Sequence, residues 1–326
     1  MRRRTLLLAT GACAALAAAR ALAQAKSPPR VALILFSKPG ASDPLLAAFT
    51  ARLKELGYAE GRDVVIEKDW YEGRIERLPA VAQKIVASNP AVIVSVATPA
   101  TMALAKATRT IPVVFVAITN PDKAGFVASL ARPGGNMTGT SFRSEAMDTK
   151  LMEAVRETIP AARRVAVFDP AGDPIMARIR AGAQKRFESM GFEVEFLPVK
   201  DAEDLSPAID EAARRKFDLL YAHPLGLLAL NAQKIAELAL ARRLVLVGPR
   251  RFFADAGGLM SYSNDLKADF RAAAGFVHRI LKGAKPGDLP VEQPDVFQLV
   301  LNLRTAKALG IKFPQSVLLQ ATEVIE

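Results

Sequence analysis

Histidine and cysteine are scarce in this chain of 326 residues, which contains two histidines and one cysteine. The histidines are His223 and His278, and the cysteine is Cys13. Zinc sites are usually built from three or four such ligands that converge in space, so we expect no metal. The sequence also lacks the G-x-S-x-G, G-x-x-x-x-G-K-[ST] and G-x-G-x-x-G motifs of serine hydrolases, phosphate-binding loops and dinucleotide-binding folds. These absences argue against catalysis and against a bound cofactor.

A basic stripe with interleaved aromatic residues is also missing, which argues against nucleic-acid binding. The formal net charge is nevertheless +11. Part of the excess lies in the pairs Arg163-Arg164, Arg214-Arg215 and Arg242-Arg243, each placed where a helical pattern ends and a strand-like run begins. Cations there complement the negative end of a helix dipole, so we interpret these pairs as structural.

The N-terminus has the three parts of a secretory signal peptide. Residues 2–4 are arginines, residues 5–19 are an apolar stretch, and residues 21–25 offer two A-x-A cleavage sites. The stretch is shorter than the roughly 20 residues that span a bilayer, so we expect residues 1–25 to be cleaved rather than to anchor the chain. Arg3-Arg4 and the residues that follow fit the twin-arginine export pattern.

Cleavage of this signal would remove Cys13 and four arginines, and would lower the net charge by four, from +11 to +7. The rest of the chain then has no cysteine and forms no disulfide. With about 300 residues and a composition that is 51% hydrophobic, it is large enough to be stabilised by its core alone.

Short runs rich in valine and isoleucine alternate with longer amphipathic runs after the signal. Several of the short runs are apolar throughout, as expected of parallel strands covered by helices on both faces. The repeated strand–helix units predict a doubly wound α/β architecture. The expected strands are residues 31–36, 64–70, 92–96, 113–116, 165–168, 194–199, 219–222 and 244–247. The expected helices are residues 45–56, 75–87, 100–107, 148–157, 175–189, 202–215 and 229–241.

The strand–helix pattern restarts at Val165 after the glycine- and proline-rich segment 131–139, so we expect two Rossmann-like lobes. The tail predicts further elements, which are a strand at 257–262, a long helix at 266–281, an extended connector at 283–294, a strand at 297–301 and a short helix at 304–309. A tail that returns to lobe one and then crosses again would give three hinge crossovers, which suit closure around a ligand. The expected division is residues 28–141 and 262–285 for lobe one, and residues 142–261 and 286–326 for lobe two.

Five segments resemble the ABC-transporter substrate-binding family, whose better-known members look like tryptophan- and tyrosine-binding proteins. They are SLARPGGNMTG at 129–139, GGLMSY at 257–262, ILKGAKPGDLPVEQP at 280–294, FQLVLNLRTAKALGI at 297–311 and ATEVIE at 321–326. The similarity runs from about Arg30 to Glu326. It implies a type I periplasmic-binding fold with a ligand in the cleft, an ABC permease as partner and a monomeric carrier.

Two segments match no sequence motif of known ligand specificity. They are Ser37-Lys38-Pro39-Gly40 and Tyr221-Ala222-His223-Pro224. The resemblance therefore indicates transport and leaves the ligand open.

Ligands of open α/β sheets bind beyond the carboxyl ends of the strands, and this rule selects candidate residues. Thr98 and Pro99 follow the third expected strand and open a helix, with Thr98 expected as N-cap and Pro99 at the first helical position. The free N–H groups of that helix end would suit a carboxylate. Alternatively, Thr98 only caps the helix. Ser37 follows the first strand, and Thr119 and Asn120 follow the fourth.

Three further candidates belong to lobe two and the hinge. Asp173 lies in the loop after the fifth expected strand, where it would pair with an ammonium group or cap the next helix. His223 follows the strand at 219–222, where it would donate to a ligand oxygen or be an ordinary turn residue. Tyr262 ends the strand at 257–262, where its ring would cover an apolar ligand or pack in the hinge.

These features predict a periplasmic solute receptor that closes two lobes on a small molecule and delivers it to a permease. An amino acid is the leading ligand class, aromatic ones included, because a helix N-terminus suits its carboxylate and Asp173 suits its amine. An exported α/β enzyme, a hydrolase or isomerase acting in the same cleft, is the alternative. A receptor that signals to a membrane sensor also remains open.

Overall fold

The computed structural model describes residues 27–41, 43–142, 144–171, 174–224, 226–293 and 297–326. The predicted signal peptide, with Cys13, lies outside the described residues, and so does Asp173. In the described part of the chain, the helices are too short or too polar to cross a membrane.

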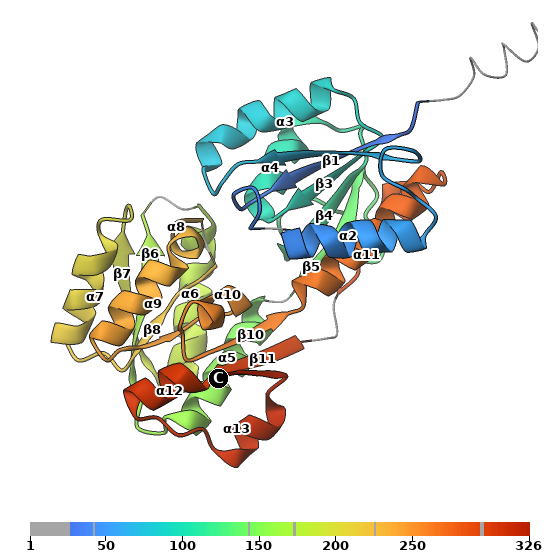
Figure 1. Cartoon of the computed structure of the whole chain (residues 1–326). Helices are drawn as coiled ribbons and strands as arrows, with labels where there is room; N and C mark the ends of the chain where they lie inside the picture. The colour runs from blue at the N-terminus through green and yellow to red at the C-terminus, as the bar shows by residue number, and fades with distance from the viewer. Residues whose placement is uncertain (1–26, 42, 143, 172–173, 225, 294–296) are drawn as a thin grey trace, which may run out of the picture.

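Lobe one is built on a parallel sheet whose strand order is β2-β1-β3-β4-β5 (Figure 1). Its strands are β1 (Arg30–Leu35), β2 (Val65–Trp70), β3 (Val92–Val96), β4 (Val113–Thr119) and β5 (Met137–Phe142). Alternate residues of β1 enter two separate cores: Val31 packs with α2 (Asp43–Glu55) and α11 (Leu266–Leu281), and Ala32 packs with α3 (Leu78–Ala87) and α4 (Thr98–Ala107). Helices therefore cover both faces, which is why the strands have apolar residues at successive positions.

Lobe two is built on a larger sheet, ordered β12-β11-β10-β9-β8-β6-β7. Its strands are β6 (Arg164–Pro170), β7 (Glu193–Val199), β8 (Leu219–Tyr221), β9 (Val245–Val247), β10 (Met260–Asn264), β11 (Phe297–Asn302) and β12 (Glu323–Ile325). Strands β10 and β11 are antiparallel, and the other neighbours are parallel. These observations confirm the predicted α/β fold class.

Two groups of helices cover the faces of the lobe-two sheet (Figure 1). One group is α5 (Ser144–Thr158), α6 (Pro174–Ser189), α12 (Leu303–Leu309) and α13 (Gln315–Gln320). The other is α7 (Leu205–Arg214), α8 (Gly226–Leu230), α9 (Ala232–Ala241) and α10 (Arg251–Asp255). Two 3-10 turns complete the described elements, η1 (Ile75–Arg77) before α3 and η2 (Pro286–Asp288) after α11.

The chain crosses between the lobes three times. It passes from β5 of lobe one to α5 of lobe two, from β10 back to α11, and from the segment after η2 to β11. Before the third crossing this segment lies along β5, where Thr138 Oγ1 donates to the Leu289 carbonyl at 2.7 Å and Ser141 N donates to the Glu292 carbonyl at 2.9 Å. The second crossing therefore follows Asn264 and the third follows Glu292, whereas the expected boundaries were at 262 and 286.

Strand β5 was not expected from the sequence, because its residues MTGTSF contain no valine or isoleucine. Its polar side chains are buried, and the two threonines are hydrogen-bonded, as when the Ala117 N–H donates to Thr140 Oγ1 at 3.0 Å. Gly139 has a φ of 148°, and a Cβ there would lie 1.9 Å from the Phe115 carbonyl oxygen. Hydrogen bonding and close backbone approach, rather than apolar pattern, therefore specify this strand.

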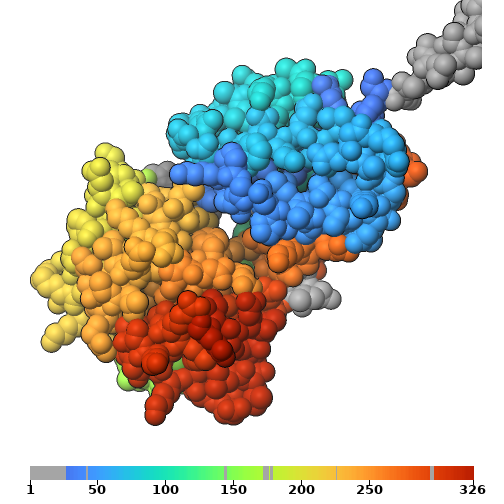
Figure 2. All heavy atoms as spheres, viewed as in Figure 1, coloured from blue at the N-terminus to red at the C-terminus, as the bar shows by residue number. Residues whose placement is uncertain are grey.

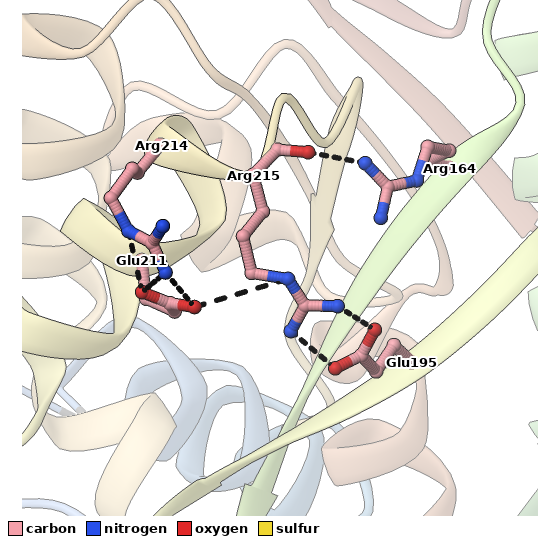
Figure 3. Close-up of polar contacts among 5 residues, drawn as sticks. All are labelled: Arg164, Glu195, Glu211, Arg214 and Arg215. Carbon is pink, nitrogen blue, oxygen red and sulfur yellow. Dashed lines mark hydrogen bonds and ion pairs between the residues drawn. The ribbon is translucent and has the colours of Figure 1, made fainter.

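The arginine pairs lie at the expected helix–strand junctions, and Figure 3 shows the local contacts of Arg164, Arg214 and Arg215. Arg215 forms a two-pronged ion pair with Glu195 on β7, and Arg214 Nη2 donates to Glu211 Oε1 at 2.7 Å. Arg164 donates to the Arg215 carbonyl oxygen, and its guanidinium lies 4.4 Å from the centre of the Phe217 ring. These contacts agree with the structural interpretation of the pairs.

Candidate functional site

The carboxyl ends of the parallel strands of both lobes face each other across the hinge. In Figure 2 the surfaces of the two lobes, blue and orange, are separated by a hollow. Two adjoining cavities, of about 180 and 270 Å³, lie there and are lined by residues of both lobes. Thr98 and Thr119 line both cavities, so the two meet at the ends of β3 and β4.

The smaller cavity is mainly apolar. Its lobe-one wall includes aromatic and aliphatic side chains from the strand ends, namely Phe36, Tyr71, Val96, Val116 and Phe142. Its lobe-two wall includes Pro224, Ala229, Arg250 and Phe252. Tyr71 is fully buried, and its hydroxyl has no hydrogen-bond partner among the described residues. An apolar part of a ligand fits this cavity by its chemistry.

The larger cavity is polar and carries charges of both signs. From lobe one it is lined by Thr98, Thr119, Asn120, Lys123 and Ala124. From lobe two it is lined by Glu145 and Asp148 of α5, by Ile179, Gly182, Ala183 and Arg186 of α6, and by His223 after β8. Asn120 Nδ2 donates to Glu145 Oε1 at 3.4 Å, which joins the two lobes. The cavity therefore offers both cationic and anionic groups to a polar ligand.

The backbone is strained where lobe one borders the cavities. Ala97 has φ 72° and ψ 155°, a combination that essentially only glycine adopts without cost. Ala117 and Asn120 also have positive φ, of 54° and 46°. Other non-glycine residues with positive φ, such as Lys216 and Arg243, follow helix ends, where this conformation is common. Strain away from helix ends is typical of ligand-binding segments.

The N-terminus of α4 differs from its expected form. The N-cap is Ala97, Thr98 is the first helical residue and Pro99 the second, and no side chain caps the helix. The expectation that Thr98 is the N-cap is therefore wrong, because the chain already turns at Ala97. The Thr98 side chain lies at the junction of the two cavities instead.

A buried carboxylate organises the lobe-two side of the polar cavity. Asp148 Oδ1 accepts a hydrogen bond from the Tyr221 hydroxyl at 2.5 Å, and Asp148 Oδ2 accepts one from Arg186 Nη1 at 3.0 Å. Burial raises the pKa of Asp148 to about 6, although the Tyr221 hydrogen bond and the Arg186 charge act in the opposite direction.

His223 lies beside this group, with its ring edge-on to Tyr221 at 4.9 Å between ring centres. Only 4% of the residue is exposed, and Nε2 has no hydrogen-bond partner among the described residues. Burial, helped by the charge of Arg186, lowers the pKa of His223 to about 3. The imidazole is therefore neutral at neutral pH.

A second polar network joins the lobes at the hinge. The Arg250 guanidinium lies 4.4 Å from the centre of the Phe142 ring, and Nη1 donates to Asn264 Oδ1 at 2.6 Å. Asn264 in turn donates to Asp269 at the start of α11. Burial lowers the pKa of Arg250 to about 10 and raises that of Asp269 to about 6. The network ties the lobe-two wall of the apolar cavity to a helix of lobe one.

Five of the residues selected from the sequence line the cavities, namely Thr98, Pro99, Thr119, Asn120 and His223. Ser37 and Tyr262 do not line either cavity. The Tyr262 ring stacks on Phe297 at 5.6 Å with an interplanar angle of 7°, as the hinge-packing alternative expects.

Sequence reasoning missed Asp148, Arg186 and Arg250. Arg250 comes three residues after β9. The rule that ligands bind beyond the carboxyl ends of strands would therefore have selected it. Asp148 and Arg186 lie within helices, where the sequence alone does not distinguish a charged residue of the site from one on the surface. The tertiary arrangement was needed to find them.

Known proteins are similar to this chain over most of its length. Residues 30–325 match the profile of the family described as ABC transporter substrate binding protein. A tyrosine-binding protein of Clostridioides difficile (strain R20291) is 24% identical over 271 residues, which cover 83% of this chain and 77% of that protein.

Solved structures share the whole architecture. An ABC domain from Streptococcus pneumonia in complex with L-Trp has a TM-score of 0.83 at 25% identity, and the match covers 92% of this chain and all of that one. A conserved domain protein from Vibrio cholerae has a TM-score of 0.84 at 27% identity, over 91% of this chain and all of that one. Both have two-lobed folds of the same kind.

Proposed function

Because the chain belongs to the ABC transporter substrate-binding protein family, we propose that it is the extracytoplasmic receptor of an importer. It closes its two lobes on a small molecule and delivers that molecule to a permease in the membrane. The observation that carries the proposal is the pair of adjoining cavities, whose walls come from both lobes and from the carboxyl ends of their strands.

The ligand class that fits best is an amino acid with an apolar, aromatic side chain. The apolar cavity accepts the side chain, and the adjoining polar cavity offers cations and carboxylates to a zwitterionic head group. Lys123 and Arg186 are the cations. Glu145 is the carboxylate for the ammonium group, because both oxygens of Asp148 are already engaged. Similarity to a structure holding L-Trp and to a tyrosine-binding protein supports this class.

The proposed lobe-one contacts are made by Thr98, Pro99, Thr119 and Asn120, which lie where the two cavities meet or in the polar one. His223 contributes from lobe two. Closure brings these groups together, and a ligand that touches both lobes favours the closed form by the contacts that exist only there.

Native mass spectrometry of protein purified from the periplasm, followed by thermal-shift screening of L-amino acids, tests the proposal. A ligand present at about 100 times its dissociation constant stabilises the folded state by about 2.7 kcal/mol. We expect aromatic amino acids to raise the melting temperature, and neutral sugars to leave it unchanged. Binding to none of them, together with hydrolysis of an added ester or amide, would contradict the receptor function and favour an enzyme.

A further inference from the structure

A cation is held in a fixed position on the lobe-two wall of the polar cavity. Both oxygens of Asp148 are engaged, one by Tyr221 and the other by Arg186. The Asp148 side chain is 4% exposed, whereas that of Arg186 is 18% exposed and lines the cavity. A guanidinium carries five N–H donors, so Arg186 can keep its ion pair and still donate to a bound molecule.

His223 is a second, independent indication of a ligand at the same wall. Its Nε2 is buried without a partner among the described residues, and the residue lines the cavity together with Arg186. A buried polar atom without a hydrogen bond is costly, and such atoms in native proteins call for an explanation. A ligand oxygen that accepts from Nε2 would supply the missing partner.

The facing wall of lobe one also favours an anion. Helix α4 begins at Thr98, and its first turn has N–H groups without helical partners at the positive end of the helix dipole. The N-cap residue is Ala97, and no side-chain hydrogen bond caps this helix end. Thr98 lines the same cavity as Arg186 and His223, so a ligand in this cavity faces both walls.

We propose that the carboxylate of the ligand bridges the two lobes. Arg186 and His223 donate to it from lobe two, and Thr98 with the N-terminus of α4 donates from lobe one. Asp148 and Tyr221 are positioning residues, which hold the Arg186 guanidinium. The inference rests on the proposed function and adds to it that the carboxylate strengthens binding and is required for closure, because the carboxylate contacts both lobes only when they meet.

Pairs of ligands that differ only in this group test the proposal. L-tryptophan is compared with L-tryptophanamide, and L-tyrosine with L-tyrosinamide, by isothermal titration calorimetry. Because charge-assisted hydrogen bonds are stronger than neutral ones, we expect the wild-type protein to prefer each acid over its amide on the order of 10- to 100-fold. This comparison requires no variant.

Arg186→Gln then identifies the residue responsible. We expect this variant to lose affinity for the acids and keep its affinity for the amides, so that the preference falls towards 1. Arg180→Gln is the matched control: Arg180 is also on α6, its side chain is 51% exposed, and it pairs with Asp169 at 2.6 Å away from the cavity lining. We expect the control to retain the wild-type preference. Asp148→Asn should lower the preference partly, because Arg186 loses its support.

Small-angle X-ray scattering provides the readout for closure. The radius of gyration should fall when L-tryptophan is added and should not change with L-tryptophanamide. Equal affinity of the wild type for acid and amide would overturn this inference and leave the amino-acid receptor standing. An equal loss for both ligands in Arg186→Gln would show that Arg186 is only structural. Binding of none of the four probes would overturn the proposed ligand class, and this inference with it.

Discussion

His223 provides a quantitative test of the electrostatics of the cleft. Burial lowers its pKa from 6.5 to about 3 in the folded protein, so between these pH values the unfolded chain binds a proton that the folded protein does not. The contribution of neutral His223 to stability is therefore fully present above pH 6.5 and is lost as the pH falls towards the folded-state pKa.

The size of this effect follows from the two pKa values. One pKa unit corresponds to about 1.4 kcal/mol, so at pH 5 the wild-type protein has lost about 2 kcal/mol of the stability that His223 contributes at neutral pH. Asp148 and Asp269 act in the opposite direction. Burial raises their pKa values to about 6, so their contributions are present at low pH and are lost as the pH rises through 6.

A variant separates His223 from these acids. The unfolding free energies of the ligand-free wild type and His223→Gln are measured by urea denaturation at pH 7 and pH 5. We expect the variant to gain about 2 kcal/mol relative to the wild type between pH 7 and pH 5, because glutamine does not titrate. His278→Gln is the control, because it removes the second histidine of the chain, which lies on α11. If the unfolding free energies of wild type and variant differ by the same amount at pH 7 and pH 5, the argument that burial keeps His223 neutral is refuted.

Other perturbations test the hinge, the core and export. Arg250→Met should lower the free energy of unfolding by about 3 kcal/mol, because it leaves Asp269 buried without a cation. In a double-mutant cycle, adding Asp269→Asn should restore part of this loss. Gly139→Ala should lower the free energy of unfolding by about 3 kcal/mol or more, because its Cβ would meet the Phe115 carbonyl oxygen. Gly275→Ala in α11 is the control, because no atom lies within 4 Å of the added Cβ. In the same denaturation assay it should raise the free energy of unfolding by about 0.5–1 kcal/mol. Changing Arg3 and Arg4 to lysine should block export by the twin-arginine route, and normal accumulation of the double variant in the periplasm would reject that route.

The fold was predictable because apolar runs and amphipathic runs alternate along most of the chain, and both patterns indicate the same α/β architecture. Apolar runs such as 92–96 are buried on both faces of a sheet, and amphipathic runs such as 266–281 cover them. Strand β5 escaped because its buried threonines are satisfied by tertiary hydrogen bonds, which no local pattern shows. Helix α10 is one short turn and has too few residues for a helical period to be visible.

The candidate site was predictable in part, for a geometric reason. The carboxyl ends of parallel strands meet at one edge, so position in the sequence selected Thr98, Thr119, Asn120 and His223, and all four line the cavities. Arg186 and Asp148 contribute from helix flanks, and their pairing depends on how α5 packs against α6. Such a contact between segments far apart in sequence follows only from the tertiary structure.

A crystal structure of the protein grown with L-tryptophan tests the central claim most directly. We expect one molecule between the lobes, with its indole ring among Phe36, Phe142 and Phe252. We expect its carboxylate within hydrogen-bond distance of Thr98 and Arg186. Electron density for the ligand on an outer face of either lobe, or an empty cleft at saturating tryptophan, would contradict it.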